Sequence, residues 1–568
     1  MNTKTYPGKG LTIPQLIFAL TEELKRTIHS PPLTFEEVSQ LDQDTSAVLA
    51  DIREWKNSLV PINRIPSDIL SLIPTHLPSQ EDRFQASYVC RHWRRTFLQC
   101  ADLWSELSLS QGEVYVKNLL ERTKGSPLHV SIHGEVPVGA SRLLSSHTRR
   151  IKHLGVFSGW ADVQEFSEVT SGPFPLLQTL TVNDMVNGRP FDEKVPLPLL
   201  LSSAVNLKEL FIYSSEWSPF SSNFVFPNLV SLYLFVAPQE VSRFCVSRFL
   251  DFLEASPMLQ EVSLTTFIEI SFEGIPQGRV VILPNAEKLK VTVTNGGPAY
   301  KIAAHISRPS ARTTSIMHKR LPDEIFSEEI FPTPANWKAI VHQHTRSPLE
   351  EATLEIKAGE VSTFRLTFQS HDATAIELLF ASEEDDDRDD LLSDETYNKV
   401  LTQAIRTIRS HPQLVDLKCL HIRDGFSPFQ ISHAVKEIGR LFRSLGPLDK
   451  FTISNSDLRR YLHSYLVLPE GSIERIEESV VFPSIKEFVT SHPVNLDDPE
   501  FSAIVALAQS HHERGIPFER VLIRGERVLL RGERVLLRGE RMPAEMEKLR
   551  KWVGSAEYCF ELHNAEED

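Results

Sequence analysis

The sequence has few cysteines and no arrangement of them that would hold a metal or a disulfide framework. Its five cysteines are scattered along 568 residues, and no two of them form a Cys-x-x-Cys pair. Zinc sites and small disulfide-rich folds need such closely spaced cysteines. The chain also lacks an Asn-x-Ser/Thr acceptor for N-linked glycans. Both absences predict a reducing location, in the cytoplasm, the nucleus or both.

Long apolar runs and an excess of basic residues are missing as well. No run approaches the roughly 18 apolar residues of a membrane span. The apolar patch near Ile17 is followed at once by Glu22 and Glu23, so the sequence does not predict a secretory signal. A formal net charge of −15 disfavours sequence-independent binding of nucleic acid, which needs a basic surface. We therefore expect neither a membrane nor a nucleic acid as partner.

Catalytic motifs are also missing. The chain contains no GxSxG, GxGxxG, GxxxxGK[ST] or HExxH sequence. His511, His512 and Glu513 come nearest to a ligand cluster, but adjacent histidines on a helix face different ways, which predicts a solvated helix end. His342 and His344 would share one face of a strand without a third ligand. The sequence thus predicts a protein that is not an enzyme and holds no cofactor or metal.

The most informative stretch runs from residue 61 to residue 107, PINRIPSDILSLIPTHLPSQEDRFQASYVCRHWRRTFLQCADLWSEL. Pro66 suits the first turn of a helix, because the N–H groups of that turn have no partner within the helix. Asp68 suits it because the N-terminal end of the helix dipole is positive. The next apolar residues recur at spacings of three and four and so share one helix face: Ile65, Ile69, Leu72 and Ile73.

A second helix is predicted to begin at Ser79, because Ser79 and Asp82 have the spacing of a capping box. Its apolar face carries aromatic and aliphatic residues: Phe84, Tyr88, Val89, Trp93 and Phe97. A closing Ala-Asp-Leu-Trp ends the unit at Trp104. Three short helices bury their own apolar faces poorly, so we expect a partner or a neighbouring domain to cover them.

The order IPSDIL, LPSQEDRFQASYVCRHWRRT and ADLW resembles the F-box, in particular the F-box-like proteins abundant in mushroom-forming fungi (basidiomycetes). The usual pattern has a Leu-Pro-x-Glu-x-Leu helix, a second Leu-Pro, a Val-Cys-Arg-x-Trp helix and a closing Leu-Trp. Ile65, Asp68 and Phe84 are mild departures from it. The alternative is an ordinary three-helix segment that packs on its own domain.

Helices are also predicted before this module. Residues 13 to 28 form a short apolar candidate, and residues 33 to 60 form an amphipathic helix that leads into the F-box. The apolar positions of the second helix recur at sevens, fours and threes: Leu41, Val48, Ile52, Trp55 and Leu59. This helix either folds back on its own domain, which its length favours, or forms a short coiled-coil contact.

After Trp104 a small unit recurs: an apolar residue, two residues of any kind, an apolar residue, one of any kind, and a further apolar residue. Its middle position falls at Leu154, Leu180, Leu210, Leu232, Val262 and Leu289, then at Leu420, Phe451, Phe488 and Val521. Xaa-Pro steps precede several copies and favour extended backbone. Helices are predicted between the strands, over residues 245 to 253 and 434 to 445.

A strand and a helix every 20 to 30 residues resembles leucine-rich repeats, here without the usual Asn or Cys at the turn. Such repeats stack into one core with a curved parallel sheet. A conventional α/β domain with a parallel sheet is the alternative. The predicted fold is therefore α/β: N-terminal helices (1–60), a three-helix F-box (61–107) and an irregular leucine-rich-repeat solenoid (108–568).

Three segments interrupt this pattern. Residues 295 to 395 break the spacing and are predicted to continue the repeats with insertions. The acidic block 383–390 is predicted to be an exposed loop, since it lacks the spacing of a calcium loop. A duplicated RGERVLL heptad (524–541) contains Gly525, Gly532 and Gly539, which argue against a coiled coil. We interpret it as a duplicated strand and turn, followed by a capping helix over 545–553.

An F-box followed by leucine-rich repeats is similar to the substrate-recognition subunits of SCF-type cullin-RING ubiquitin ligases, which are not catalytic themselves. The resemblance implies that the F-box binds a Skp-type adaptor and, through it, a cullin, while the repeats bind a target protein. The implied adaptor-binding residues lie in and between its helices: Ile65, Pro66, Ile69, Leu72, Ile73, Leu77, Pro78, Val89, Cys90 and Trp93. Of these, Trp93 is also a candidate for the module's own core.

The target surface is predicted on the strand positions that alternate with the buried ones: Thr179, Thr181, Glu209, Phe211, Ser231 and Tyr233. The identity of the target cannot be derived from these residues. The alternative function is a repeat scaffold whose F-box-like module recruits no ligase. The two differ at Ile69 and Leu72, which a receptor exposes and a scaffold buries.

Overall fold

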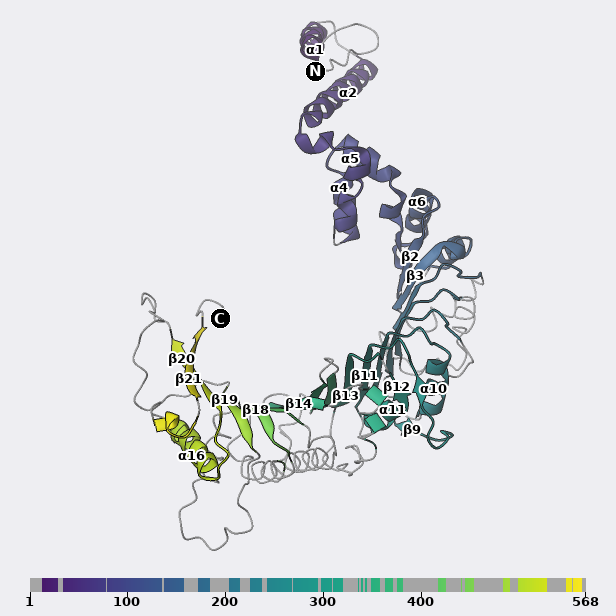
Figure 1. The fold of residues 1–568 in the computed structure, drawn as a ribbon. Coiled ribbons are helices and arrows are strands. Elements are labelled where there is room, and N and C mark those ends of the chain that lie inside the picture. Colours follow the sequence, from purple (N-terminus) through teal and green to yellow (C-terminus); the bar gives the residue numbers. More distant parts are fainter. Residues whose placement is uncertain are drawn as a thin grey trace, which may run out of the picture. The chain divides into compact units, whose positions relative to one another are not determined.

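The computed structural model divides the chain into two compact units, Met1–Lys152 and His153–Asp568 (Figure 1). The structure describes residues 13–28, 34–77, 79–134, 137–157, 172–183, 204–214, 225–236, 243–267, 269–294, 298–308, 310–319, 336, 339–340, 343–344, 349–357, 363–370, 375–381, 417–424, 441, 445–453, 484–490, 499–528, 548–553 and 555–563. Residues 108–152, assigned to the repeats from the sequence, fall in the N-terminal unit with the F-box.

The first unit begins with the two predicted helices, α1 (Ile13–Ile28) and α2 (Phe35–Ser58). A capping box starts α2: Thr34 Oγ1 accepts a hydrogen bond from the N–H of Glu37 at 3.3 Å, and the Glu37 carboxylate accepts one from the N–H of Thr34 at 2.8 Å. The hydrogen bonds that the N–H and the hydroxyl of Thr34 donate to this carboxylate lower the pKa of Glu37. None of the described side chains of α2 is buried.

The F-box segment folds into short helices. A 3-10 turn, η1 (Pro61–Arg64), precedes the predicted first helix, which is divided into α3 (Ser67–Leu70) and η2 (Ile73–His76). Then follow α4 (Gln80–Ser87), α5 (Arg91–Gln99) and η3 (Ala101–Trp104). The unit continues with β1 (Glu106–Ser108), η4 (Leu109–Gln111), α6 (Glu113–Thr123), β2 (Leu128–His133), α7 (Val138–Ser145) and η5 (Thr148–Arg150). Strands β1 and β2 pair in parallel.

The core of this unit joins the F-box to the segment behind it. Trp104 is buried, and its indole N–H donates a hydrogen bond to the carbonyl of Phe97 at 2.8 Å. The Phe84 ring lies 5.3 Å from it, centroid to centroid, and Arg122 of α6 stacks over it at 4.9 Å. The expected cover for the F-box is thus supplied in part by α6 of the same chain.

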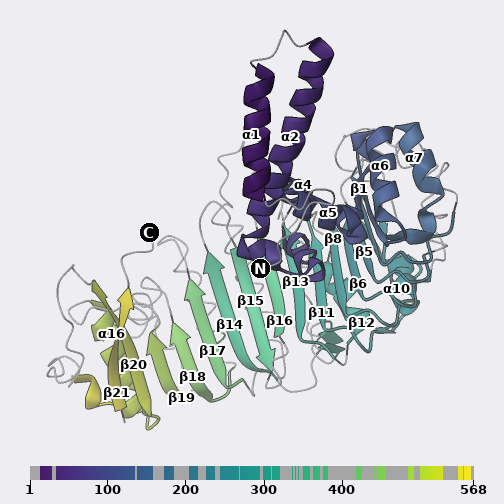
Figure 2. The ribbon, with the colours of Figure 1, turned by 90° about the horizontal axis from the view of Figure 1, so that it is seen from above.

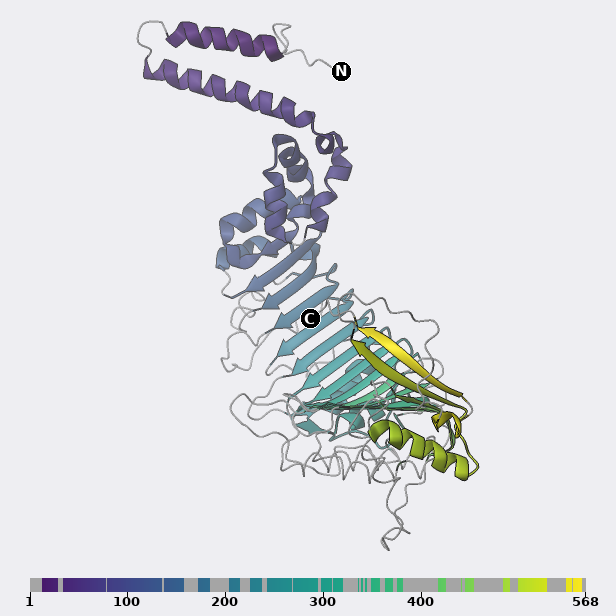
Figure 3. The ribbon, with the colours of Figure 1, turned by 90° about the vertical axis from the view of Figure 1, so that its left-hand side faces the viewer.

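The second unit is built on one large sheet. Its first strands are β3 (Ile151–Phe157), β4 (Thr179–Asn183), β5 (Glu209–Ser214), β6 (Ser231–Val236), β8 (Glu261–Thr266) and β11 (Lys288–Val293), and each pairs in parallel with the next (Figure 3). The middle apolar residues of the sequence repeat are register partners across these strands: Leu154, Leu180, Leu210, Leu232, Val262 and Leu289.

The repeat thus marks the buried face of the sheet, because alternate residues of a strand face opposite sides. The last strands continue the arrangement: β17 (Cys419–Asp424), β18 (Leu448–Ile453), β19 (Ile485–Thr490) and β20 (Arg520–Val528). Their middle residues are again register partners: Leu420, Phe451, Phe488 and Val521. The predicted strand positions are therefore correct from β3 to β11 and from β17 to β20.

The middle of the sheet differs from the predicted parallel array (Figure 2). Strands β13 (Thr313–Lys319), β14 (Leu349–Lys357), β15 (Thr363–Ser370) and β16 (Ala375–Ala381) lie there in the spatial order β13, β16, β15, β14. Strand β15 is antiparallel to both of its neighbours. Short connections join β14 to β15 and β15 to β16, and such connections suit antiparallel hairpins, whereas a parallel crossover needs a dozen residues or more.

Helices cover the buried face where the structure describes them. Helix α10 (Val246–Glu254) agrees with the predicted helix at 245–253, and α11 (Ala299–Ala304) packs against β11 and β13. Two short parallel pairs accompany them, β7 (Phe244–Cys245) with β9 (Ile270–Ser271) and β10 (Val281–Ile282) with β12 (Ile306–Ser307).

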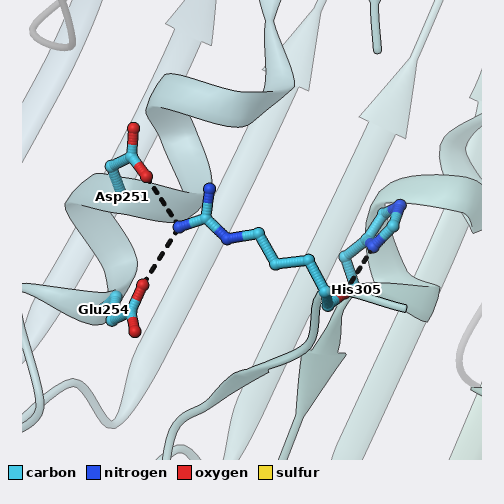
Figure 4. A network of polar contacts seen from close by, with 4 residues as sticks. Asp251, Glu254 and His305 are labelled. Carbon is cyan, nitrogen blue, oxygen red and sulfur yellow. Dashed lines mark hydrogen bonds and ion pairs between the residues drawn. The ribbon is translucent and has the colours of Figure 1, made fainter. Parts of the chain in front are cut away.

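An arginine ties these outer elements together. The guanidinium of Arg279 donates to Asp251 at 2.6 Å and to Glu254 at 3.0 Å, and its carbonyl lies 2.7 Å from Nδ1 of His305 (Figure 4). Since Asp251 and Glu254 belong to α10, the contact fixes that helix to the turn before β10.

The C-terminal end corrects one prediction and adds a strand. His511, near the end of α16 (Pro499–Glu513), is buried and stacked on Phe518 at 4.4 Å between ring centroids, so this helix end is not simply solvated. Residues 548–550, within the helix predicted at 545–553, are helical, and a strand that the sequence did not predict follows them: β21 (Ser555–His563), which pairs in parallel with β20. Within 545–553, Trp552 lies edge-on to His512 at 5.5 Å.

Other predicted segments fall wholly or largely outside the described residues. They are the acidic block 383–390, most of the helix at 434–445 and the second and third copies of the duplicated segment after Val528. None of the described helices has the length and apolar character of a bilayer span. The described residues also contain no group of three or more His, Cys, Asp or Glu side chains arranged to hold a metal.

Candidate adaptor-binding surface

A group of large apolar side chains on the F-box helices faces solvent. Ile69 in α3 and Leu72, two residues after its end, are 50% and 53% exposed. Tyr88 and Val89, between α4 and α5, are 63% and 60% exposed, and Ile62 in η1 is 42% exposed. We call these five residues the apolar surface. Large exposed apolar side chains gathered on one small module are typical of a protein interface.

Buried residues directly beneath hold the apolar surface in place. Leu70, between the exposed Ile69 and the exposed Leu72, is fully buried. Trp93 is 8% exposed, packs edge-on to Phe97 at 5.4 Å, and donates its indole N–H to the side-chain oxygen of Asn63 at 2.6 Å. Because Asn63 belongs to η1 and Trp93 to α5, this hydrogen bond fixes the first helical turn to the last helix of the module.

Local capping determines where α4 begins and ends. Ser79 Oγ accepts a hydrogen bond from the N–H of Asp82 at 3.1 Å and donates to the Asp82 carboxylate at 2.6 Å, so Ser79 is the N-cap of α4 through its side chain alone, without the reciprocal backbone bond of the predicted capping box. Tyr88 is the C-cap of α4, and the guanidinium of Arg94 stacks over its ring at 4.9 Å. The chain therefore turns at Tyr88 and Val89, which leaves both side chains outside the module.

Charged residues follow Val89 in the sequence, on α5, and pair with α2. Arg91 approaches Asp51 and Glu54 of α2 at 3.6 and 3.7 Å, and Arg95 approaches Glu54 at 3.8 Å. These pairs are solvent-exposed and weak, so they position the end of α2 without stabilising it greatly. Charged side chains next to exposed apolar ones are the usual composition of an interface.

The predicted adaptor-binding residues divide into three groups. Pro66, Ile69, Leu72 and Val89 are exposed, whereas Ile65, Ile73, Leu77 and Cys90 are half-buried. Trp93 belongs to the interior, where its indole N–H bonds to Asn63 of η1, and Pro78 lies outside the described residues. Ile62 was not foreseen as an exposed residue, and no pattern in the sequence distinguishes it. Tyr88 was placed in a helix stripe, and its position as a C-cap removes it from that stripe.

A second group of predicted residues lies on the open face of the large sheet. Thr179, Thr181, Glu209, Phe211, Ser231 and Tyr233 are all half-buried or exposed, and the residues between them are buried. The hydroxyl of Thr179 donates to Glu209 at 3.1 Å, and the rings of Phe211 and Tyr233 stack at 4.6 Å. Glu261, Tyr213 and Phe235 share this face and were missed, although the same alternation marks them.

Comparison with known proteins assigns the segment that carries the apolar surface to a family. Residues 62–110 match the F-box-like family. No curated protein matches the chain. The matched segment includes all five residues of the apolar surface together with Trp93 and Trp104. Residues 62–110 are therefore an F-box-like domain, which in general binds a Skp-type adaptor and serves ubiquitin ligases.

Proposed function

We propose that this protein is the substrate-recognition subunit of an SCF-type cullin-RING ubiquitin ligase, in the cytoplasm, the nucleus or both. The apolar surface binds the Skp-type adaptor and, through it, a cullin. The second unit is an irregular leucine-rich-repeat solenoid whose open sheet face binds a target protein. The subunit positions the target and performs no chemistry itself.

The observation that carries this proposal is the exposure of Ile69 and Leu72 beside the buried Leu70. Within one turn, the chain buries the side chain that its own core needs and leaves two large apolar neighbours in water. A module that served only as internal scaffold would bury all three, since burial of one such side chain contributes about 1.5–3 kcal/mol. The exposed pair is thus explained by a partner.

The test is a pull-down of the purified full-length protein with a Skp-type adaptor. Leu72→Asp places a charge within the apolar surface and is expected to abolish capture, because the carboxylate would be desolvated without a partner. Val114→Asp is the matched control: Val114 is 75% exposed in α6, outside the F-box match, and this variant should bind like wild type. Failure of well-folded wild type to bind, or binding by Leu72→Asp, would reject the proposal and favour the scaffold function.

A further inference from the structure

Aromatic side chains stand in neighbouring positions on the open face of the sheet. Phe211 of β5 and Tyr233 of β6 are register partners, and their rings are stacked at 4.6 Å with planes 6° apart. Tyr213 and Phe235 form the next pair along the same strands at 5.7 Å, and Phe267 lies 4.9 Å from Phe235. These rings lie on the face opposite the apolar core, so the folding of the sheet does not require them.

One carboxylate on this face is fully engaged and fixes the Tyr233 ring. The Tyr233 hydroxyl donates to one oxygen of Glu261 at 2.5 Å, and the ammonium group of Lys288 donates to the other oxygen at 2.5 Å. The hydrogen bond to Glu261 raises the pKa of Tyr233 to about 12. The stacked pair is therefore held rigidly before any partner arrives, which lowers the entropy cost of binding.

A second carboxylate is only partly engaged. Glu209 lies in register between Thr179 of β4 and Ser231 of β6, and it is exposed. Its carboxylate accepts a hydrogen bond from the Thr179 hydroxyl at 3.1 Å. Among the described residues, no cation forms an ion pair with it. It can thus accept further hydrogen bonds from a positively charged group.

Glu209 and Phe211 border the same place on the sheet. They lie two residues apart on one strand and so point to the same side. The register partner of Phe211 on β4 is Thr181, and the next along is Gly155 of β3. The side of the Phe211 ring away from Tyr233 therefore faces Thr181, beyond which the ring of Phe157 lies over Gly155, and the Glu209 carboxylate accepts the hydrogen bond of Thr179 on β4. A flat cation above β4 would contact the ring and the carboxylate together.

We propose that this place recognises an arginine side chain of the target protein, an inference that rests on the receptor function proposed above. The guanidinium group stacks on Phe211 and donates hydrogen bonds to Glu209. Arginine fits better than lysine, because its planar group stacks on aromatic rings and donates a pair of hydrogen bonds to one carboxylate. An apolar segment fits worse, since it would bury Glu209 without a partner. The net charge of −15 also favours a basic segment.

The test uses the full-length protein and a displayed library of random twelve-residue peptides. Arginine should be enriched among the selected peptides. The best binder is then compared with the same peptide carrying citrulline, which keeps the shape of arginine but not its charge. Citrulline, or Glu209→Gln in the protein, should each weaken binding about tenfold, and both together should weaken it little more than either alone.

The matched control is Glu487→Gln, because Glu487 lies on the same sheet in β19, far along it from Glu209, and should leave the affinity unchanged. Selection of apolar or acidic peptides without arginine, selection of no peptide, or additive effects of citrulline and Glu209→Gln would each overturn the proposal. No adaptor is present in this experiment. A failure of adaptor capture would thus count against the receptor function alone, and a failure of arginine selection against this inference alone.

Discussion

Two leucines of the F-box, two positions apart, have different roles. Leu70 is fully buried, whereas Leu72 is 53% exposed. We predict that Leu70→Ala lowers the free energy of unfolding by about 2–5 kcal/mol through the cavity it leaves. Leu72→Ala should change it by less than ~0.5 kcal/mol and should weaken adaptor binding. Urea unfolding of the two variants, followed by tryptophan fluorescence, measures both values, and equal losses of stability would contradict this division.

Buried histidines make the stability of the second unit depend on pH. His344 is buried, its Nδ1 accepts a hydrogen bond from Arg308 Nε at 3.1 Å, and its Nε2 lies 3.1 Å from the carbonyl of Ala303. Burial, followed by the charge of Arg308, lowers the pKa of His344 to about 3. The guanidinium of Arg308 also donates to the carbonyl of Thr313 at 3.0 Å, and to the hydroxyl of Thr314. A neutral histidine is therefore part of the folded state.

The folded pKa of His344 lies below that of the unfolded chain, so its contribution is complete above about pH 6.5 and is lost as the pH falls. The expected loss is about 1.4 kcal/mol for each pH unit below ~6.5. In His344→Gln the amide replaces both hydrogen bonds without a titrating group. The urea midpoint of wild type should thus fall more between pH 7.5 and 5.5 than that of the variant. Equal decreases of the two midpoints would show that His344 does not titrate with unfolding.

At the scale of a helix, Ser79→Ala tests the cap of α4. The substitution removes the oxygen that accepts the N–H of Asp82, and we expect a loss of about 1 kcal/mol in stability and weaker adaptor binding, because α4 leads to Tyr88 and Val89. Ser39→Ala is the contrasting case. Ser39 lies inside α2, where alanine favours the helix, so this variant should be neutral or slightly more stable. Thermal unfolding of both variants measures the change in stability relative to wild type. A change of the same sign and size in both variants would exclude a capping role for Ser79.

The strands of the sheet show how far a local pattern can predict an element. The apolar repeat placed Leu180, Leu210 and Leu232 on one buried face, and they are register partners. The pattern works because alternation along a strand directly reflects burial. It does not reveal pairing order, which depends on contacts between segments far apart in sequence. For this reason β15 was expected as a strand, while its antiparallel place between β14 and β16 was not.

At the scale of the whole molecule, the sequence predicts which residues form the two surfaces better than it predicts how those residues are arranged. The F-box motif identified most of the apolar surface, but whether Trp93 or Val89 faces solvent depends on where α4 ends, which capping and packing decide together. The residues on the open sheet face were predicted by alternation alone. Their grouping into a stacked pair beside a partly engaged carboxylate follows from the register between strands, which the sequence does not contain.

Because the two surfaces belong to separate units, they should fail independently. Leu72→Asp is expected to lose adaptor capture and to keep the affinity of wild type for the selected arginine peptide. Glu209→Gln should show the reverse, with capture intact and peptide affinity reduced about tenfold. Both assays are made on the same preparations of each variant. A variant that loses both activities would point to unfolding across the two units, or to coupling between them, and would contradict a receptor that holds its adaptor and its target on independent surfaces.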